Sequence, residues 1–152
     1  MTPANIICIK WGTKYPAYYV NRLYAGVQRH LSRPFRFFCV TDDTSGIRPE
    51  VECLPLPKEP FEAQIAATLA ESKRKGAFGK ISLFKPGLID ASGPLLGFDL
   101  EVVITGPLDE LIDFAPGKIC MRHDWLGARR GRPDGHGSVF RYDPALHGYL
   151  YN

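Results

Sequence analysis

Two carboxylates, Asp99 and Glu101, stand two positions apart within an otherwise apolar stretch, 95–104. In an extended strand, side chains two positions apart point the same way and stand about 6–7 Å apart. Ionised carboxylates with apolar neighbours are unfavourable unless a cation, hydrogen-bond donors or solvent at a strand end compensate their charge. Carboxylate oxygens suit Mg2+ or Mn2+, ions that keep coordination sites for water and substrate phosphates. The pair therefore indicates either a divalent-cation site or the acidic, solvated face of an edge strand.

The strand that would position this pair, 98–104, is one of several β segments in the sequence. A nearly continuous apolar run at 5–11 is typical of a strand that is covered on both faces. Apolar residues at helical spacing predict a helix over 16–31, and a second apolar run, 35–41, predicts the next strand. A strand, a helix and a strand connected at these lengths favour a right-handed βαβ unit and a parallel sheet.

The rest of the chain continues as short elements separated by glycine and proline. Residues 129–133 are basic and rich in these two residues, so we expect a mobile, exposed loop there. The fold class predicted is α/β, a single domain over 1–152 with a mostly parallel central sheet flanked by helices. The further elements that we expect are a strand at 51–56, a helix at 60–75, a short helical piece after Lys80, a helix after Pro107, strands at 118–122 and 139–142, and a last helix from Pro144.

Composition and charge narrow the classes of function. Charged residues make up 23% of the chain and hydrophobic residues 45%, which is typical of a globular protein. The formal net charge of +3 permits an anionic ligand but is too small to indicate nucleic-acid binding, so we expect no nucleic-acid partner. The chain lacks a secretory signal pattern and any apolar run of about 18 residues, so we expect a cytoplasmic protein without a transmembrane segment. Association with a membrane surface stays open, as does assembly into a homo-oligomer.

The cysteines show no metal-binding spacing. They are widely separated, and each lies beside apolar neighbours within a predicted strand. We therefore predict reduced thiols that pack in the core, and no zinc site. The four residues are Cys8, Cys39, Cys53 and Cys120.

The loop after the first predicted strand, 11–16, bears on nucleotide binding. It holds one glycine where the GxGxxG fingerprint has three, and the sequence has no GxxxxGK[ST] motif. Ligands of open α/β sheets bind at the carboxyl ends of parallel strands, where this loop would meet Asp42. Tyr15 could stack on a base there, and Asp42 could accept hydrogen bonds from it. The alternative is that Tyr15 packs internally and that Asp42 caps a turn.

Four stretches, 6–15, 35–43, 79–81 and 98–109, together resemble a bacterial glycosyltransferase of the GT-A fold, similar to family 8 enzymes. The likeness runs over nearly the whole chain. Its most specific part is Asp99-Leu100-Glu101, where that family usually has Asp-x-Asp, followed by an apolar strand and a Gly-x-Leu-Asp turn.

The resemblance implies a metal-dependent transferase that moves a hexose from a nucleotide sugar, with a UDP-sugar as the expected donor, to a hydroxyl acceptor such as a saccharide. It implies that Asp99 and Glu101 hold Mn2+ or Mg2+ beside the donor diphosphate, where the ion neutralises charge on the leaving group. No catalytic base is identifiable. The resemblance further implies a nucleotide site at Lys10, Thr13, Tyr15, Asp42 and Lys80, donor-sugar contacts at His136 and Ser138, and an acceptor side at Arg122, Asp124 and Arg129.

Two departures from the family pattern leave other functions open. Glutamate at 101 is one methylene longer than aspartate, which moves an oxygen by about 1.5 Å, whereas metal ligands are held within about 0.2 Å. Enzymes of this kind are also usually longer at the C-terminus. One alternative is therefore a shortened domain that binds a nucleotide or a partner chain without turnover. A nucleotidyltransferase is a second alternative, although that class normally carries a glycine-rich basic loop that 11–16 lacks.

Overall fold

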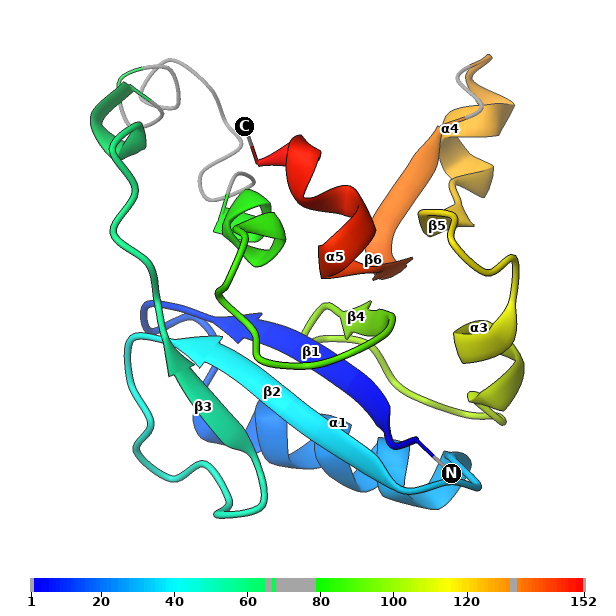
Figure 1. The fold of residues 1–152 in the computed structure, drawn as a ribbon, viewed down its shortest axis with the longest axis horizontal. Coiled ribbons are helices and arrows are strands. Elements are labelled where there is room, and N and C mark those ends of the chain that lie inside the picture. Colours follow the sequence, from blue (N-terminus) through cyan, green and yellow to red (C-terminus); the bar gives the residue numbers. More distant parts are fainter. Residues whose placement is uncertain (1, 65–66, 68–78, 132–133, 152) are drawn as a thin grey trace.

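A six-stranded sheet forms the centre of the protein, in the order β3-β2-β1-β4-β6-β5 (Figure 1). The computed structural model describes residues 2–64, 67, 79–131 and 134–151. Strands β1 to β4 run parallel, whereas β6 is antiparallel to both of its neighbours, β4 and β5. The strands are β1 (Ala4–Lys10), β2 (Phe35–Thr41), β3 (Glu52–Pro55), β4 (Leu95–Phe98), β5 (Cys120–His123) and β6 (Gly135–Tyr142).

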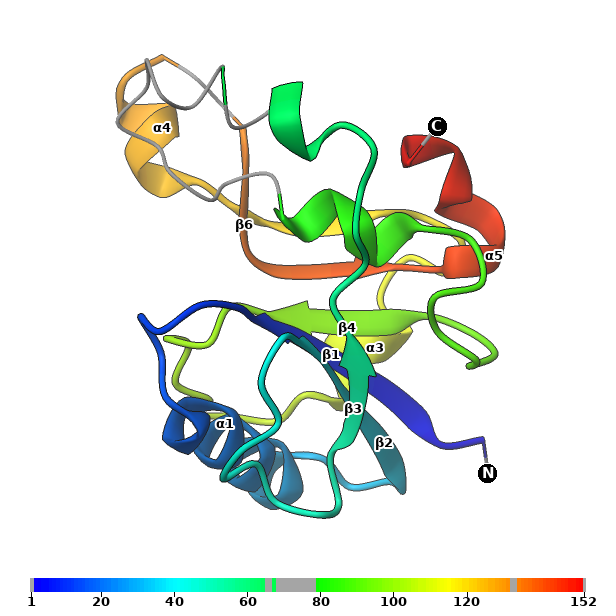
Figure 2. The same cartoon turned by 90° about the vertical axis from the view of Figure 1, so that its left-hand side faces the viewer.

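Helices cover both faces of this sheet, as Figure 2 shows. Side chains alternate between the two faces of a strand, so neighbouring apolar residues of β1 and β2 enter different cores. Ile6 packs with the buried residues of α1, and Ile7 packs with Leu83 on the other face. The helices are α1 (Ala17–His30), α3 (Asp109–Asp113), α4 (Trp125–Arg129) and α5 (Pro144–His147), with 3-10 helices η1 (Gly79–Phe84) and η2 (Gly148–Leu150). The α/β architecture predicted from the sequence is therefore confirmed.

Tyr142 of β6 attaches η1 to the second face of the sheet. Its ring is fully buried, and its hydroxyl donates a hydrogen bond of 2.7 Å to the carbonyl oxygen of Leu83 in η1. Burial raises the pKa of this phenol, because the charged form would lose its solvation. The bond satisfies a polar group that would otherwise be costly inside the core.

The strand order contains a topological switch point beside β1. The chain builds β2 and β3 on one side of β1 and then returns to place β4 on the other side. The loops that follow β1 and β4 consequently diverge at the carboxyl edge of the sheet, which is where ligands of open α/β sheets bind.

The prediction of a strand over 98–104 is wrong. β4 ends at Phe98, and the chain then turns, with the amide of Val102 donating to the carbonyl oxygen of Asp99 at 3.1 Å. The reason is a lack of strand partners, because β1 pairs with β4 only as far as Gly97 and β6 only as far as Phe98. Beyond the turn, Ile104 instead packs against α1.

Most other predicted elements appear near their expected positions. The helix predicted at 16–31 is α1, and the predicted strands correspond to β1, β2, β3, β5 and β6. Most of the helix predicted at 60–75 lies outside the described residues. Arg129, which we expected in a loop, is the last residue of α4, and 132–133 are not among the described residues. Within the described part, no helix is long and apolar enough to cross a bilayer.

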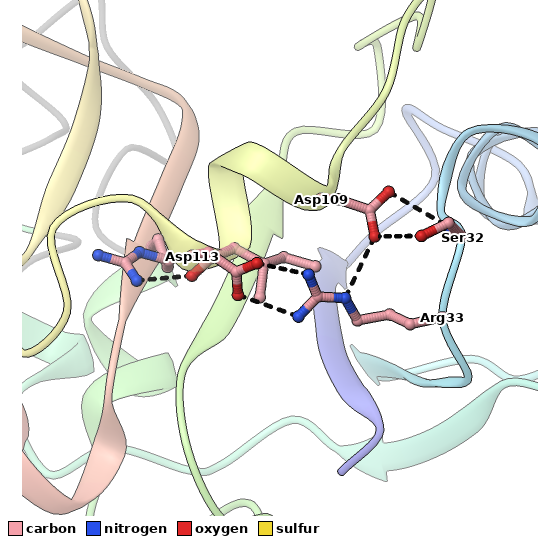
Figure 3. Close-up of polar contacts among 6 residues, drawn as sticks. Ser32, Arg33, Asp109 and Asp113 are labelled. Atoms are coloured by element: carbon pink, nitrogen blue, oxygen red, sulfur yellow. Dashed lines mark hydrogen bonds and ion pairs between the residues drawn. The ribbon is translucent and has the colours of Figure 1, made fainter. Parts of the chain in front are cut away.

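The amino edge of the parallel strands holds a cavity of about 400 Å3 and a cluster of charges beside it. Arg33, just before β2, donates to Asp109 at 3.1 Å and binds both carboxylate oxygens of Asp113 (Figure 3). Ser32 adds a 2.7 Å hydrogen bond from its hydroxyl to Asp109. These bonds hold α3 against the segment that enters β2, at the opposite edge from the carboxylates 99 and 101.

Candidate functional site

Lys80 connects three segments at the carboxyl edge of the sheet. Its ammonium group pairs with the carboxylate of Asp99 and donates a 2.7 Å hydrogen bond to the carbonyl oxygen of Gly137 in β6. The amide of Asp99 in turn donates to the carbonyl oxygen of Ser138 at 2.9 Å. A cation, an acid and the beginning of β6 thus meet just beyond β4, although they are far apart in the sequence.

Glu101 faces the loop that follows β1. Its carboxylate accepts a hydrogen bond from the hydroxyl of Tyr15, which raises the pKa of that phenol. Lys14 lies over the Tyr15 ring, 4.9 Å from its centroid, and Tyr19 packs edge-on against it at 5.0 Å. Tyr15 therefore packs internally, which is the alternative expected for it, and it also reaches the acidic turn. Stacking of a base on its ring stays a prediction.

The loops after β1 and β2 are joined by Asp42. Its carboxylate accepts a 2.9 Å hydrogen bond from the amide of Gly12, so this acid positions the neighbouring loop. Asp43 accepts from Ser45, and this bond lowers the pKa of Asp43, with a smaller contribution from the charge of Lys10. Lys10 itself is buried, with 4% of its surface exposed, whereas Thr13 is exposed.

His136 and Ser138 form a local pair at the start of β6. The amide of Ser138 donates to Nδ1 of His136 at 3.2 Å, and the Ser138 hydroxyl lies 3.0 Å from the same nitrogen. Because Nδ1 accepts from an amide, the ring proton of neutral His136 is on Nε2. The side chain is exposed, so its Nε2 can donate to a ligand beside β6.

Two of the three residues expected on the acceptor side lie beside His136. Arg122 is its partner in the β5–β6 pairing, and Arg122 also lies over the Trp125 ring at 5.4 Å. Asp124 accepts hydrogen bonds from the backbone at the start of α4, and the Gly127 amide contributes most to lowering its pKa. Arg129 lies exposed at the far end of α4, away from this group.

The site offers few protein ligands to a divalent cation. Asp99 and Glu101 are both hydrogen-bonded or paired to other side chains, and within the described residues no group of three or more His, Cys, Asp and Glu is placed to hold a metal ion. Mg2+ is commonly bound by one or two carboxylates, with substrate phosphates and waters completing its octahedron. The donor set therefore fits a cation that arrives with a diphosphate better than a permanently bound one.

Sequence reasoning missed two residues of this site. Gly137 supplies the carbonyl oxygen that Lys80 binds, and a Cβ there would lie 3.5 Å from the Lys80 ammonium. Trp11 borders Gly79, where an added Cβ would lie 3.7 Å from the indole nitrogen. The closely spaced glycines at 135 and 137 were the signal that backbone groups approach other atoms here.

Comparison with protein-family models found none that matches this chain, and comparison with curated protein sequences found no match either. The glycosyltransferase resemblance of the motifs therefore remains a prediction.

Proposed function

We propose that this protein is a glycosyltransferase that moves a hexose from a nucleotide sugar, with a UDP-sugar as the donor, to a hydroxyl acceptor in the presence of Mn2+ or Mg2+. The observation that supports it most is the meeting of Lys80, Asp99 and the start of β6 at the topological switch point. A diphosphate needs positive charge, which Lys80 supplies, and an edge of this kind is the usual ligand site of the architecture.

The residues at this edge suggest a division of roles. The loop 11–15 and Asp42 would hold the nucleoside, and the Lys80 ammonium would contact the diphosphate. A divalent cation bound by Asp99 and Glu101 would neutralise the charge that develops on the leaving nucleoside diphosphate. His136, through Nε2, would donate to a hydroxyl of the sugar, and Arg122 would border the acceptor.

A second candidate is a domain that binds a nucleotide without turnover. It is supported by the observation that both carboxylates of the pair already have partners. Asp99 forms an ion pair with Lys80, and Glu101 accepts a hydrogen bond from the Tyr15 hydroxyl. A metal ion would have to compete with both partners. A site that binds the nucleotide through Lys80 alone would need no metal ion.

Calorimetric titration with UDP, with and without Mn2+, combined with assays of UDP release from UDP-hexoses, tests both candidates. We expect Mn2+ to strengthen UDP binding and Asp99→Asn to abolish that stimulation. The matched control is Glu110→Gln, which removes an exposed carboxylate of α3 elsewhere and leaves the stimulation unchanged.

The outcomes separate the alternatives. Metal-stimulated UDP binding together with UDP release from a UDP-hexose supports the transferase. UDP binding without UDP release from any UDP-hexose supports the second candidate. Pyrophosphate release from a nucleoside triphosphate and a sugar phosphate would instead indicate a nucleotidyltransferase. Unchanged Mn2+ stimulation in Asp99→Asn would exclude the proposed metal site.

A further inference from the structure

Large apolar side chains are exposed next to one another on α4. Trp125 is 63% exposed and Leu126 is 67% exposed. Figures 1 and 2 both place α4 at the periphery, beside the start of β6 and on the far side of the sheet from α1. Single exposed apolar residues are common, but adjacent ones on a peripheral helix indicate a contact surface.

The charges around these residues favour an anionic partner. Between 120 and 131 the chain has three arginines, Arg122, Arg129 and Arg130, and one carboxylate, Asp124. Backbone amides at the start of α4 donate hydrogen bonds to that carboxylate and keep its pKa low, so it stays ionised. Arg129 and Arg130 are both exposed. The ionised Asp124 offsets only part of the positive charge of this segment, and exposed Asp134, whose carbonyl oxygen accepts from the Asp124 amide, adds one further acid beside it.

A tryptophan and a leucine next to exposed arginines are the side chains that interfacial protein segments place in a bilayer. The indole and the aliphatic side chain enter the boundary between head groups and acyl chains, while arginines stay at the level of the phosphates. A segment of this kind lies on the surface and does not span the membrane. Each arginine near an anionic bilayer contributes about 1 kcal/mol.

We infer that the α4 surface, defined as Trp125, Leu126, Arg129 and Arg130, binds peripherally to an anionic lipid bilayer. Because Arg122 pairs with His136 across β5 and β6, binding would bring the carboxyl edge of the sheet close to the lipid head groups. This inference does not depend on the proposed transferase function. Membrane binding and sugar transfer are measured separately, so either can fail without the other.

Co-sedimentation with vesicles tests the inference, using phosphatidylcholine alone and phosphatidylcholine mixed with phosphatidylglycerol. We expect binding to the mixed vesicles that weakens as salt is raised, since salt screens the arginine–lipid attraction. The double variant Trp125→Ala/Leu126→Ala should weaken binding at least about tenfold, and Arg129→Gln and Arg130→Gln about fivefold each. Phe114→Ala, which removes a ring that is 66% exposed elsewhere, should bind like the wild type.

Fluorescence gives an independent readout of the same contact. In a Trp11→Phe background the only tryptophan is Trp125, and its emission should shift to the blue on mixed vesicles. An unshifted emission, or equal binding of the double variant and the wild type, would overturn the inference. So would self-association in the ultracentrifuge that the double variant abolishes, because the surface would then bind a second copy of this chain. Circular dichroism of each variant verifies that it is folded.

Discussion

At the scale of single residues, Lys80 is the group that holds the candidate site together. It bonds to the carboxylate of Asp99 and to the carbonyl oxygen of Gly137, so its charge is fixed at the carboxyl edge of the sheet, where the proposed diphosphate would lie. The sequence assigned Lys80 to the nucleotide site, but it did not indicate that Asp99 would be its partner. That pairing joins residues 19 positions apart through two different loops, and no local pattern encodes it.

Lys80→Met should weaken UDP binding in the absence of metal about tenfold or more, because it removes a charge-assisted hydrogen bond to phosphate. Mn2+ binding without nucleotide should strengthen, since Asp99 loses its competing cation. Calorimetry measures both affinities. Lys118→Met is the control, because that exposed lysine borders the cavity at the opposite edge of the sheet. Unaltered UDP binding in Lys80→Met would remove Lys80 from the nucleotide site.

Gly97 in β4 is required by a close contact with its cross-strand partner. A Cβ at this position would lie 2.3–2.6 Å from three ring carbons of Phe140, which pairs with Gly97 across β4 and β6. Gly97→Ala should therefore lower the free energy of unfolding by about 1–3 kcal/mol, measured by urea denaturation. Gly106→Ala meets no atom within 4 Å and should change stability by less than about 0.5 kcal/mol. Equal stability of the two variants would mean that the Phe140 ring moves aside freely.

At the scale of elements, the sequence predicted those whose burial creates a regular pattern. β1 and β2 read as apolar runs because both faces are covered, and α1 reads as a helix because one stripe of it packs on the sheet. The stretch after Phe98 has the same apolar character, yet it leaves the sheet because it has no neighbouring strand. Its apolar composition does not reflect burial either, because Leu100 is buried whereas Val103 is 66% exposed. Apolar composition alone therefore does not decide whether a segment is β structure.

The stability that comes from the contacts between α3 and the segment before β2 should decrease at acidic pH. Hydrogen bonding from Ser32, and also from Arg33, lowers the pKa of Asp109, and Arg33 lowers the pKa of Asp113. Both carboxylates therefore stabilise the fold above their unfolded pKa of about 3.9, and this contribution disappears as the pH falls through their lower folded values.

Urea denaturation between neutral pH and about pH 2 measures this contribution. Arg33→Gln should be less stable than the wild type at neutral pH, and the difference should shrink below about pH 4 as the carboxylates become protonated. Arg130→Gln, which removes an exposed arginine of the α4 surface, should follow the wild-type curve. A deficit of Arg33→Gln that stays constant with pH would show that this arginine acts through packing and not through the two acids.

At the scale of the whole molecule, the parallel strands form the buried centre from which the loops of the candidate site extend. A row of cysteines crosses it, because Cys8 pairs in register with Cys39, and Cys39 with Cys53. All four cysteines are free thiols. Cys8 and Cys39 lie in the core and Cys53 packs against it, as predicted, whereas Cys120 is partly exposed and accepts from Arg141. A hydrogen bond with Cys39, together with burial, raises the pKa of the Cys8 thiol, and burial raises the pKa of the Cys53 thiol. Little reactive thiolate therefore forms at these two positions at neutral pH.

Thiol labelling should therefore report global unfolding at two of these positions. Cys8 and Cys39 have at most 1% of their surface exposed, so a reagent reaches them only when the central strands separate. Cys53 and Cys120 are partly exposed and should label without denaturant. Peptide mass spectrometry across a urea series should give curves for Cys8 and Cys39 that coincide with the loss of circular dichroism. Rapid labelling of both in the absence of urea would mean that β1 and β2 open locally, and that the carboxyl edge is not built on a rigid centre.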